Sequence, residues 1–129
     1  MSSIDEMAQI LSDYLSDYSE SVTVDVKKAV DTVANEVNIE IKRHITFQEP
    51  TGKYVKAFRI KGVFDGRFNK GKTWHVSGEQ YRLTHLLENG HALSQGGRSR
   101  KYPHIKYGEE LAQRRMEELA REAIENAGD

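Results

Sequence analysis

The residues most able to do chemistry in this sequence are the histidine and acidic side chains between residues 85 and 91. The segment reads HLLENGH, and His104 follows it. On a helix His85 and Glu88 would share a face, and imidazole with carboxylate suits zinc or non-haem iron. The spacing matches none of the zinc-hydrolase signatures, which need two histidines four residues apart or His-x-x-Glu-His. The alternative is that His85, Glu88, His91 and His104 hydrogen-bond backbone groups around a tight turn and fix the following loop.

Nucleotide binding and nucleophilic catalysis find no support in the sequence. The glycines at Gly90, Gly96 and Gly97 belong neither to GxxxxGK[ST] nor to GxGxxG between a strand and a helix. The chain has no cysteine, and no serine lies in a nucleophile elbow. We therefore predict no catalytic residue, no cofactor and no metal ligand.

Basic residues follow this segment: Arg98, Arg100, Lys101 and Lys106, with Tyr102 among them. Such a stretch can contact nucleic-acid phosphates or stack on bases. It can equally be a solvated loop, or a contact with an acidic neighbouring subunit. The residues alone leave these alternatives open.

Charge is segregated along the chain. Residues 1–50 hold ten acidic and four basic side chains (-6), residues 51–106 hold three and twelve (+9), and residues 107–129 hold seven and three (-4), which sums to -1. Acidic ends around a basic middle favour head-to-tail contact between copies or contact with a polyphosphate. The plain alternative is charge cancellation within one fold.

Length and composition predict one domain, residues 1–129, whose stability depends on the burial of apolar side chains. The chain contains no cysteine, so disulfides cannot hold it together. No apolar run approaches the roughly 20 residues that span a bilayer. We expect a soluble, unsecreted protein with no membrane partner.

The elements that must position these residues begin with helices. Apolar residues spaced by threes and fours predict an amphipathic helix over residues 1–20, with its acidic side exposed. Ser19-Glu20-Ser21 predicts a break, after which a core helix extends from Val22 to about Ile41. Pro50-Thr51-Gly52 then predicts a turn.

In the second half of the chain the spacing of the apolar residues changes from that of a helix to that of a strand. Alternation over residues 58–64 and again over residues 73–77 predicts two strands joined by a polar connection, most economically a hairpin. Residues 81–88 predict a short helix that ends at Asn89-Gly90. Residues 92–103 predict a flexible basic loop, and a final helix is expected from about residue 108.

Over residues 81–105 the segment YRLTHLLENGHALSQGGRSRKYPHI resembles the phage tail-component family, which comprises head-tail joining and tail-completion proteins of long-tailed phages and prophages. The turn at Pro50-Thr51-Gly52, followed by Tyr54, is also similar to the family. The Lys106-Tyr107-Gly108 segment departs from the pattern and leaves the start of the last helix open. The signature residues are Tyr81, Leu83, His85, Leu86, Leu87, Glu88, Gly90, His91, Gly96, Gly97, Pro103, His104 and Ile105.

This resemblance implies an α+β fold with long N-terminal helices packed on a small, mainly antiparallel sheet, and a C-terminal helix. It implies a non-enzymatic virion protein that forms a ring, commonly a hexamer, at the head-tail junction after synthesis in the host cytoplasm. Its partners would be itself, neck or connector proteins and the major tail protein, with transient DNA contact at the basic residues. Two alternatives remain: a nucleic-acid-binding accessory protein, and a metal-dependent hydrolase.

Overall fold

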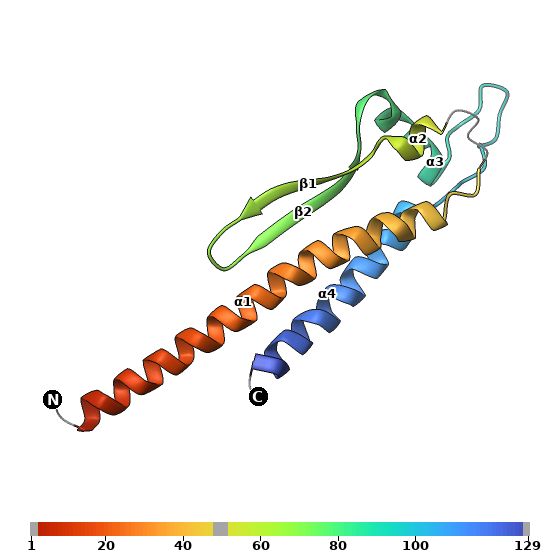
Figure 1. Cartoon of the computed structure of the whole chain (residues 1–129). Coiled ribbons are helices and arrows are strands. Elements are labelled where there is room, and N and C mark those ends of the chain that lie inside the picture. Colours follow the sequence, from red (N-terminus) through yellow and green to blue (C-terminus); the bar gives the residue numbers. More distant parts are fainter. Residues whose placement is uncertain (1–2, 48–51, 128–129) are drawn as a thin grey trace.

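The computed structural model describes residues 3–47 and 52–127 of the chain. Two long helices lie side by side, a β-hairpin lies along the first of them, and the shorter elements gather at one end (Figure 1). The predicted α+β class is confirmed. The predicted turn residues Pro50 and Thr51 lie outside the described residues. The elements are α1 (Ser3–Arg43), α2 (Lys53–Lys56), β1 (Phe58–Asp65), β2 (Lys70–Val76), a short 3-10 helix (Gly78–Gln80), α3 (Tyr81–Asn89) and α4 (Ile105–Ala127).

Helix α1 is continuous, so the predicted break at Ser19-Glu20-Ser21 is wrong. Serine caps a helix only where the helix begins, and in the interior it costs a few tenths of a kcal/mol. The apolar face also continues in phase across this segment, from Tyr18 to Ala29. Because that face packs against α4, tertiary contact outweighs the weak local preference.

The hairpin is longer than predicted. Its strands pair antiparallel with Phe58 opposite Val76 and Ile60 opposite Trp74, and β2 begins at Lys70 rather than at residue 73. The reason is that Lys70 and Lys72 reach back to α1, where they lie 2.9 and 2.6 Å from Oδ1 of Asp31. The hydrogen bond from Lys72, which has the larger effect, and the hydrogen bond from Lys70 keep the pKa of Asp31 below its ordinary value. These ion pairs attach the hairpin to the helix.

The core lies where the C-terminal half of α1 meets α2 and the hairpin. Trp74 at its edge donates a hydrogen bond from Nε1 to Asn38 of α1 (3.0 Å). The predicted core helix is therefore confirmed by the contacts of its C-terminal half. The buried cluster consists of Ile41, Tyr54, Ala57, Phe58 and Val76.

Helix α4 begins at Ile105, three residues before the predicted position. Its first turns lie directly against α1, and Gly108 is buried there. A Cβ atom on Gly108 would lie 2.6 Å from Cγ1 and 2.7 Å from Cδ1 of Ile41. Farther along, Arg115 binds Glu36 of α1 with two hydrogen bonds of 2.9 and 3.1 Å, which lower the pKa of Glu36.

Residues 3–17 of α1, here called the arm, extend beyond the end of α4 (Figure 1). Tyr18 marks the boundary, because its hydroxyl donates to the carbonyl oxygen of Ile124 near the end of α4 (3.3 Å). The predicted amphipathic helix is confirmed, but the described part of the chain leaves its apolar side uncovered. Between 55 and 76% of each large apolar residue on the arm is exposed: Ile4, Met7, Ile10, Leu11, Tyr14 and Leu15.

No helix within residues 3–47 and 52–127 has both the length and the apolar character needed to cross a membrane.

Candidate functional site

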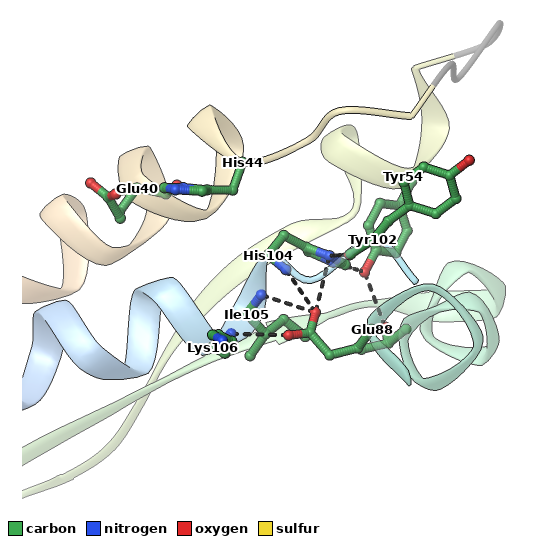
Figure 2. A network of polar contacts seen from close by, with 9 residues as sticks. Glu40, His44, Tyr54, Glu88, Tyr102, His104, Ile105 and Lys106 are labelled. Atoms are coloured by element: carbon green, nitrogen blue, oxygen red, sulfur yellow. Dashed lines mark hydrogen bonds and ion pairs between the residues drawn. The ribbon is translucent and has the colours of Figure 1, made fainter. Parts of the chain in front are cut away.

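Glu88 caps helix α4 from outside that helix. It lies in the last turn of α3, and one carboxylate oxygen accepts hydrogen bonds from the backbone N–H groups of His104 (2.9 Å) and Ile105 (3.0 Å). The other oxygen accepts from the N–H of Lys106 (3.1 Å), as Figure 2 shows. The first amides of a helix have no partner within it and carry a partial positive charge. A carboxylate is therefore a well-matched acceptor.

His104 is fully buried beside this cap. Its Nδ1 lies 2.7 Å from the carbonyl oxygen of Tyr102 and 3.1 Å from Oε1 of Glu88. Both neighbours are acceptors, so Nδ1 carries the hydrogen. In the neutral ring Nε2 then accepts a hydrogen bond from the Tyr54 hydroxyl (2.7 Å). We call Tyr54, Glu88, Tyr102 and His104 the capping cluster.

Aromatic rings close the capping cluster on the side of α1. Phe47 lies with its ring centroid 5.8 Å from that of Tyr54, 5.4 Å from Tyr102 and 6.0 Å from His104. Such tilted and edge-on contacts are favourable geometries for aromatic pairs. The cluster therefore joins the end of α1, α2, α3 and the start of α4 in one packed unit.

The loop after α3 is tied at its base. Gly90 has a φ of +72°, and a Cβ atom there would lie 2.8 Å from the carbonyl oxygen of Ser99. The N–H of Ser99 donates to the carbonyl oxygen of His91 (2.7 Å), and the N–H of His91 donates to the Ser99 hydroxyl (2.8 Å). The predicted loop over residues 92–103 is present, closed by a bridge between Ala92 and Arg98, and its residues 92–98 are exposed.

The predicted basic contact residues lie in the loop and in the first turn of α4, which flank the capping cluster residues Tyr102 and His104 in the chain. Arg98 donates to the carbonyl oxygen of Gly90 (3.3 Å), and the Arg100 guanidinium lies 5.6 Å from the Tyr102 ring centroid. Lys106 lies 5.5 Å from the ring centroid of Tyr107. All four basic residues, Arg98, Arg100, Lys101 and Lys106, are exposed. These exposed cations therefore lie at the same end of the molecule as the capping cluster.

The remaining signature residues are divided between the helix surface and the loop. Leu87 packs against the core, whereas Leu83 and Leu86 are exposed. The ring of Tyr81 lies 6.3 Å from that of His85 on the exposed side of α3. Gly96 and Gly97 are turn glycines with positive φ. Pro103 lies two residues before the final helix.

The four residues considered for a metal site do not converge. His85 lies beside Tyr81 and His91 lies 2.8 Å from the Ser99 hydroxyl, while Glu88 and His104 contact each other. Among the residues that the structure describes, no three His, Asp or Glu side chains could hold a metal ion together. Glu88 and His104 instead bind backbone groups, as the alternative interpretation predicted.

The capping role is visible in the electrostatics of Glu88. Burial raises the pKa of its carboxyl group, but the hydrogen bonds from the amides of His104, Ile105 and Lys106, together with the His104 ring, outweigh that effect. The pKa of Glu88 is consequently below its ordinary value of 4.5. The cap is therefore a stable carboxylate at neutral pH.

We expect this cap to make stability depend on pH in the acid range. Because the pKa of Glu88 is lower in the folded state than in the unfolded chain, its stabilisation is complete above about pH 5 and is lost as the pH falls through the folded-state value. Urea unfolding of the wild type and of Glu88→Gln at pH 7 and pH 3 should show a smaller difference at pH 3. A difference independent of pH would contradict this assignment. Other acidic groups titrate in both proteins and cancel from the comparison.

Sequence reasoning did not find Phe47 and Ser99, and it did not assign Tyr54 to this site. Phe47 follows α1, Tyr54 lies in α2, and Ser99 comes from the loop. None lies at a spacing that marks it in the sequence, because each meets its partner only through the tertiary fold. Tyr54 alone was singled out, as part of the family resemblance.

Comparison with known proteins identifies the family. A family model described as "Bacteriophage HK97-gp10, putative tail-component" matches residues 9–90, which is more than half of the chain. The match includes α1 from Gln9 onward, the hairpin and α3, and it ends at Gly90, before the basic loop. No curated protein and no solved structure matched the chain. The chain belongs to the HK97-gp10-like family of phage tail components, and is thus a part of the virion that contacts other phage structural proteins.

Proposed function

We propose that this tail component forms a ring, for which we expect six copies, at the junction between the phage head and tail. In that role it completes the tail or joins it to the head, binds neck or connector proteins and the major tail protein, and carries out no catalysis. It would assemble there after synthesis in the host cytoplasm. Family membership supports a structural role in the tail.

The observation that best supports a ring is that the two ends of the molecule differ in charge. The arm has Asp5, Glu6, Asp13 and Asp17 and no basic residue, whereas the capping-cluster end presents exposed Arg98, Arg100, Lys101 and Lys106 (Figure 1). Unlike ends of this kind favour heterologous contact, in which one surface of a copy meets a different surface of the next. Heterologous contacts close into rings when the rotation between copies permits.

Reversing the loop charges should abolish assembly without unfolding the subunit. In the triple variant Arg98→Glu, Arg100→Glu and Lys101→Glu, the three new carboxylates would repel the acidic helices of the neighbouring copy. We expect light scattering to show monomers with an unchanged circular dichroism spectrum. A matched control makes the same charge change at exposed positions elsewhere: Lys28→Glu, Lys42→Glu and Lys56→Glu. Unchanged assembly of the loop variant would refute the contact.

The position in the virion is tested by mixing. Light scattering is measured on the purified chain alone, with the tail-tube protein, and with connector-bearing capsids from the same phage. A ring, or a stable complex with either component, supports the proposal and indicates which side of the junction the chain contacts. A monomer that binds neither component contradicts it.

The exposed loop cations also support transient contact with DNA. Arg100 lies over the ring of Tyr102, and Lys101 beside it is exposed, so phosphates are accessible to both side chains. If the loop contacts DNA, binding of a labelled duplex should weaken steeply as salt is raised. The triple loop variant should lose this binding, and the control variant should keep it.

A further inference from the structure

The arm carries an apolar surface that its own chain leaves bare. This surface continues the face of α1 that packs on α4, but α4 ends opposite Tyr18. At about 100° per residue, the apolar residues of the arm form one broad stripe, and Glu6, Asp13 and Asp17 border one edge of it. The six exposed side chains offer on the order of 500 Å² of apolar area, more than half of the ~800 Å² that one partner usually contributes to a stable interface.

The same chain contains an open apolar groove between α1, β2 and α4. Its volume is about 460 Å³, enough for a few large aliphatic side chains but not for a whole helix. It is lined by Val33 and Val37 of α1, by Trp74 of β2, and by Ala112 and Met116 of α4, with Glu109 of α4 as the one acidic residue among the described residues that line it. Lys70 and Lys72 lie on the hairpin side of this groove. A groove of this kind can receive the apolar side chains of an amphipathic helix laid across it.

The arm cannot reach the groove of its own chain. Both belong to the uninterrupted helix α1, and Leu11 lies about 30 Å along that helix from Val33. Folding back would require α1 to break, and the structure shows no break between Ser3 and Arg43. The stripe and the groove can therefore meet only between two copies.

Charge favours this pairing over contact between two arms. The hairpin between Phe58 and Val76 contains five basic residues and one acidic residue, and even with Asp31, which pairs with Lys70 and Lys72, this side of the groove has a net charge of +3. Residues 3–17 contain four acidic residues and no basic one. An arm laid along the groove with its acidic edge toward the hairpin meets opposite charge. Two arms packed together would bring six acidic side chains, Glu6, Asp13 and Asp17 of each copy, to the border of one contact.

We propose that the arm of one copy docks in the groove between α1, β2 and α4 of the next copy. The inference rests on the self-association proposed above, and it adds an apolar contact to the charge contact of the basic loop. Each copy then offers one arm and one groove, which is a heterologous contact that continues from subunit to subunit. The partner for this arm is a second copy of the chain.

Crosslinking tests the pairing directly, because the natural chain has no cysteine. Full-length Leu11→Cys, with the thiol on the stripe, is mixed with full-length Ala112→Cys, with the thiol in the groove. After oxidation we expect a covalent dimer that requires both variants, since a disulfide needs Cα atoms within about 7 Å. Met7→Cys and Leu15→Cys are mixed with Ala112→Cys in the same way to sample the register. The control is Ser16→Cys, which lies on the exposed side of the arm opposite the stripe.

The outcomes separate this inference from the ring itself. A covalent dimer with a stripe cysteine, absent with Ser16→Cys, supports docking even if scattering finds no closed ring. Several results would overturn docking while leaving the ring intact: no covalent dimer from a protein that forms rings, equal yield from Ser16→Cys, or dimers from Leu11→Cys alone. Crosslinking of the stripe only to the tail-tube protein would assign the arm to that partner and also refute it.

A second variant removes the stripe without removing the arm. Leu11→Asp with Leu15→Asp changes two exposed side chains, so the melting temperature of the subunit should stay the same. Self-association should be lost, because the groove would have to bury two charges. Self-association equal to that of the wild type would refute the proposal.

Discussion

Replacing Glu88 with alanine is expected to lower the free energy of unfolding by about 3 kcal/mol, which corresponds to a fall of about 10 °C in melting temperature. Three backbone N–H groups lose their acceptor at once, those of His104, Ile105 and Lys106. Removing an ordinary N-cap costs about 1 kcal/mol, and this cap is charged, mostly buried and bound to a buried histidine as well. Thermal and urea unfolding followed by circular dichroism would measure the loss.

Two further variants determine the origin of that loss. Glu88→Gln keeps one acceptor oxygen but no charge, so we expect it to lose roughly half as much stability. Glu110→Gln removes an exposed carboxylate from α4 near the same end of the helix and should change stability little. Equal effects of Glu88→Ala and Glu110→Gln would show that Glu88 is not a cap. The alanine variant should also move the loop cations, weakening assembly more than its stability loss explains.

Replacing Gly108 with valine should also destabilise the fold by about 3 kcal/mol. The new side chain would occupy space already filled by Ile41, whose exposed fraction is 1%, so Ile41 cannot turn out to solvent. Gly108→Ala should be milder, because the gain of about 1 kcal/mol in helix propensity offsets part of the overlap. Urea unfolding would measure both.

A double variant tests the mechanism of this clash. Ile41→Ala removes the two atoms that would lie closest to a Cβ at position 108, so Ile41→Ala with Gly108→Val should cost less than the sum of the two single changes. Additive costs would mean that the overlap is not the cause. Gly62→Ala is the matched control, since no atom lies within 4 Å of a Cβ there.

Periodic patterns predicted the fold well where burial repeats along one element. The face from Val22 to Ile41 and the stop at Gly90 each reflect a local rule, and the structure confirms both. The strand that begins at Phe58 is present as predicted, but its alternating burial ends after Ile60, and Phe64 is exposed. The predicted boundaries of β2 and α4 were wrong, because in each case a residue far away in the chain determines where the element begins. Strand β2 begins at Lys70, where Lys70 forms an ion pair with Asp31 on α1. Helix α4 begins at Ile105 because Glu88 on α3 caps its first amides.

The candidate site was located from the sequence, but its chemistry was left open. Glu88 and His104 attracted attention as residue types that bind metals, whereas their partners are backbone amides and a carbonyl, which every residue has. No side-chain pattern can mark such partners. Tyr54 reaches His104 from fifty residues away in the chain, so only the packed fold brings the two together.

Helix α1 has a mechanical consequence that follows from its continuity. Its 41 residues make a rod about 60 Å long, which the core holds at one end and α4 supports as far as Tyr18, so that only residues 3–17 project beyond α4. A tilt of about 5° of α1 together with α4, about the core end, displaces the far tip by about 5 Å, roughly one helical turn. A small rotation near the capping cluster therefore produces a much larger displacement at the opposite end of the subunit.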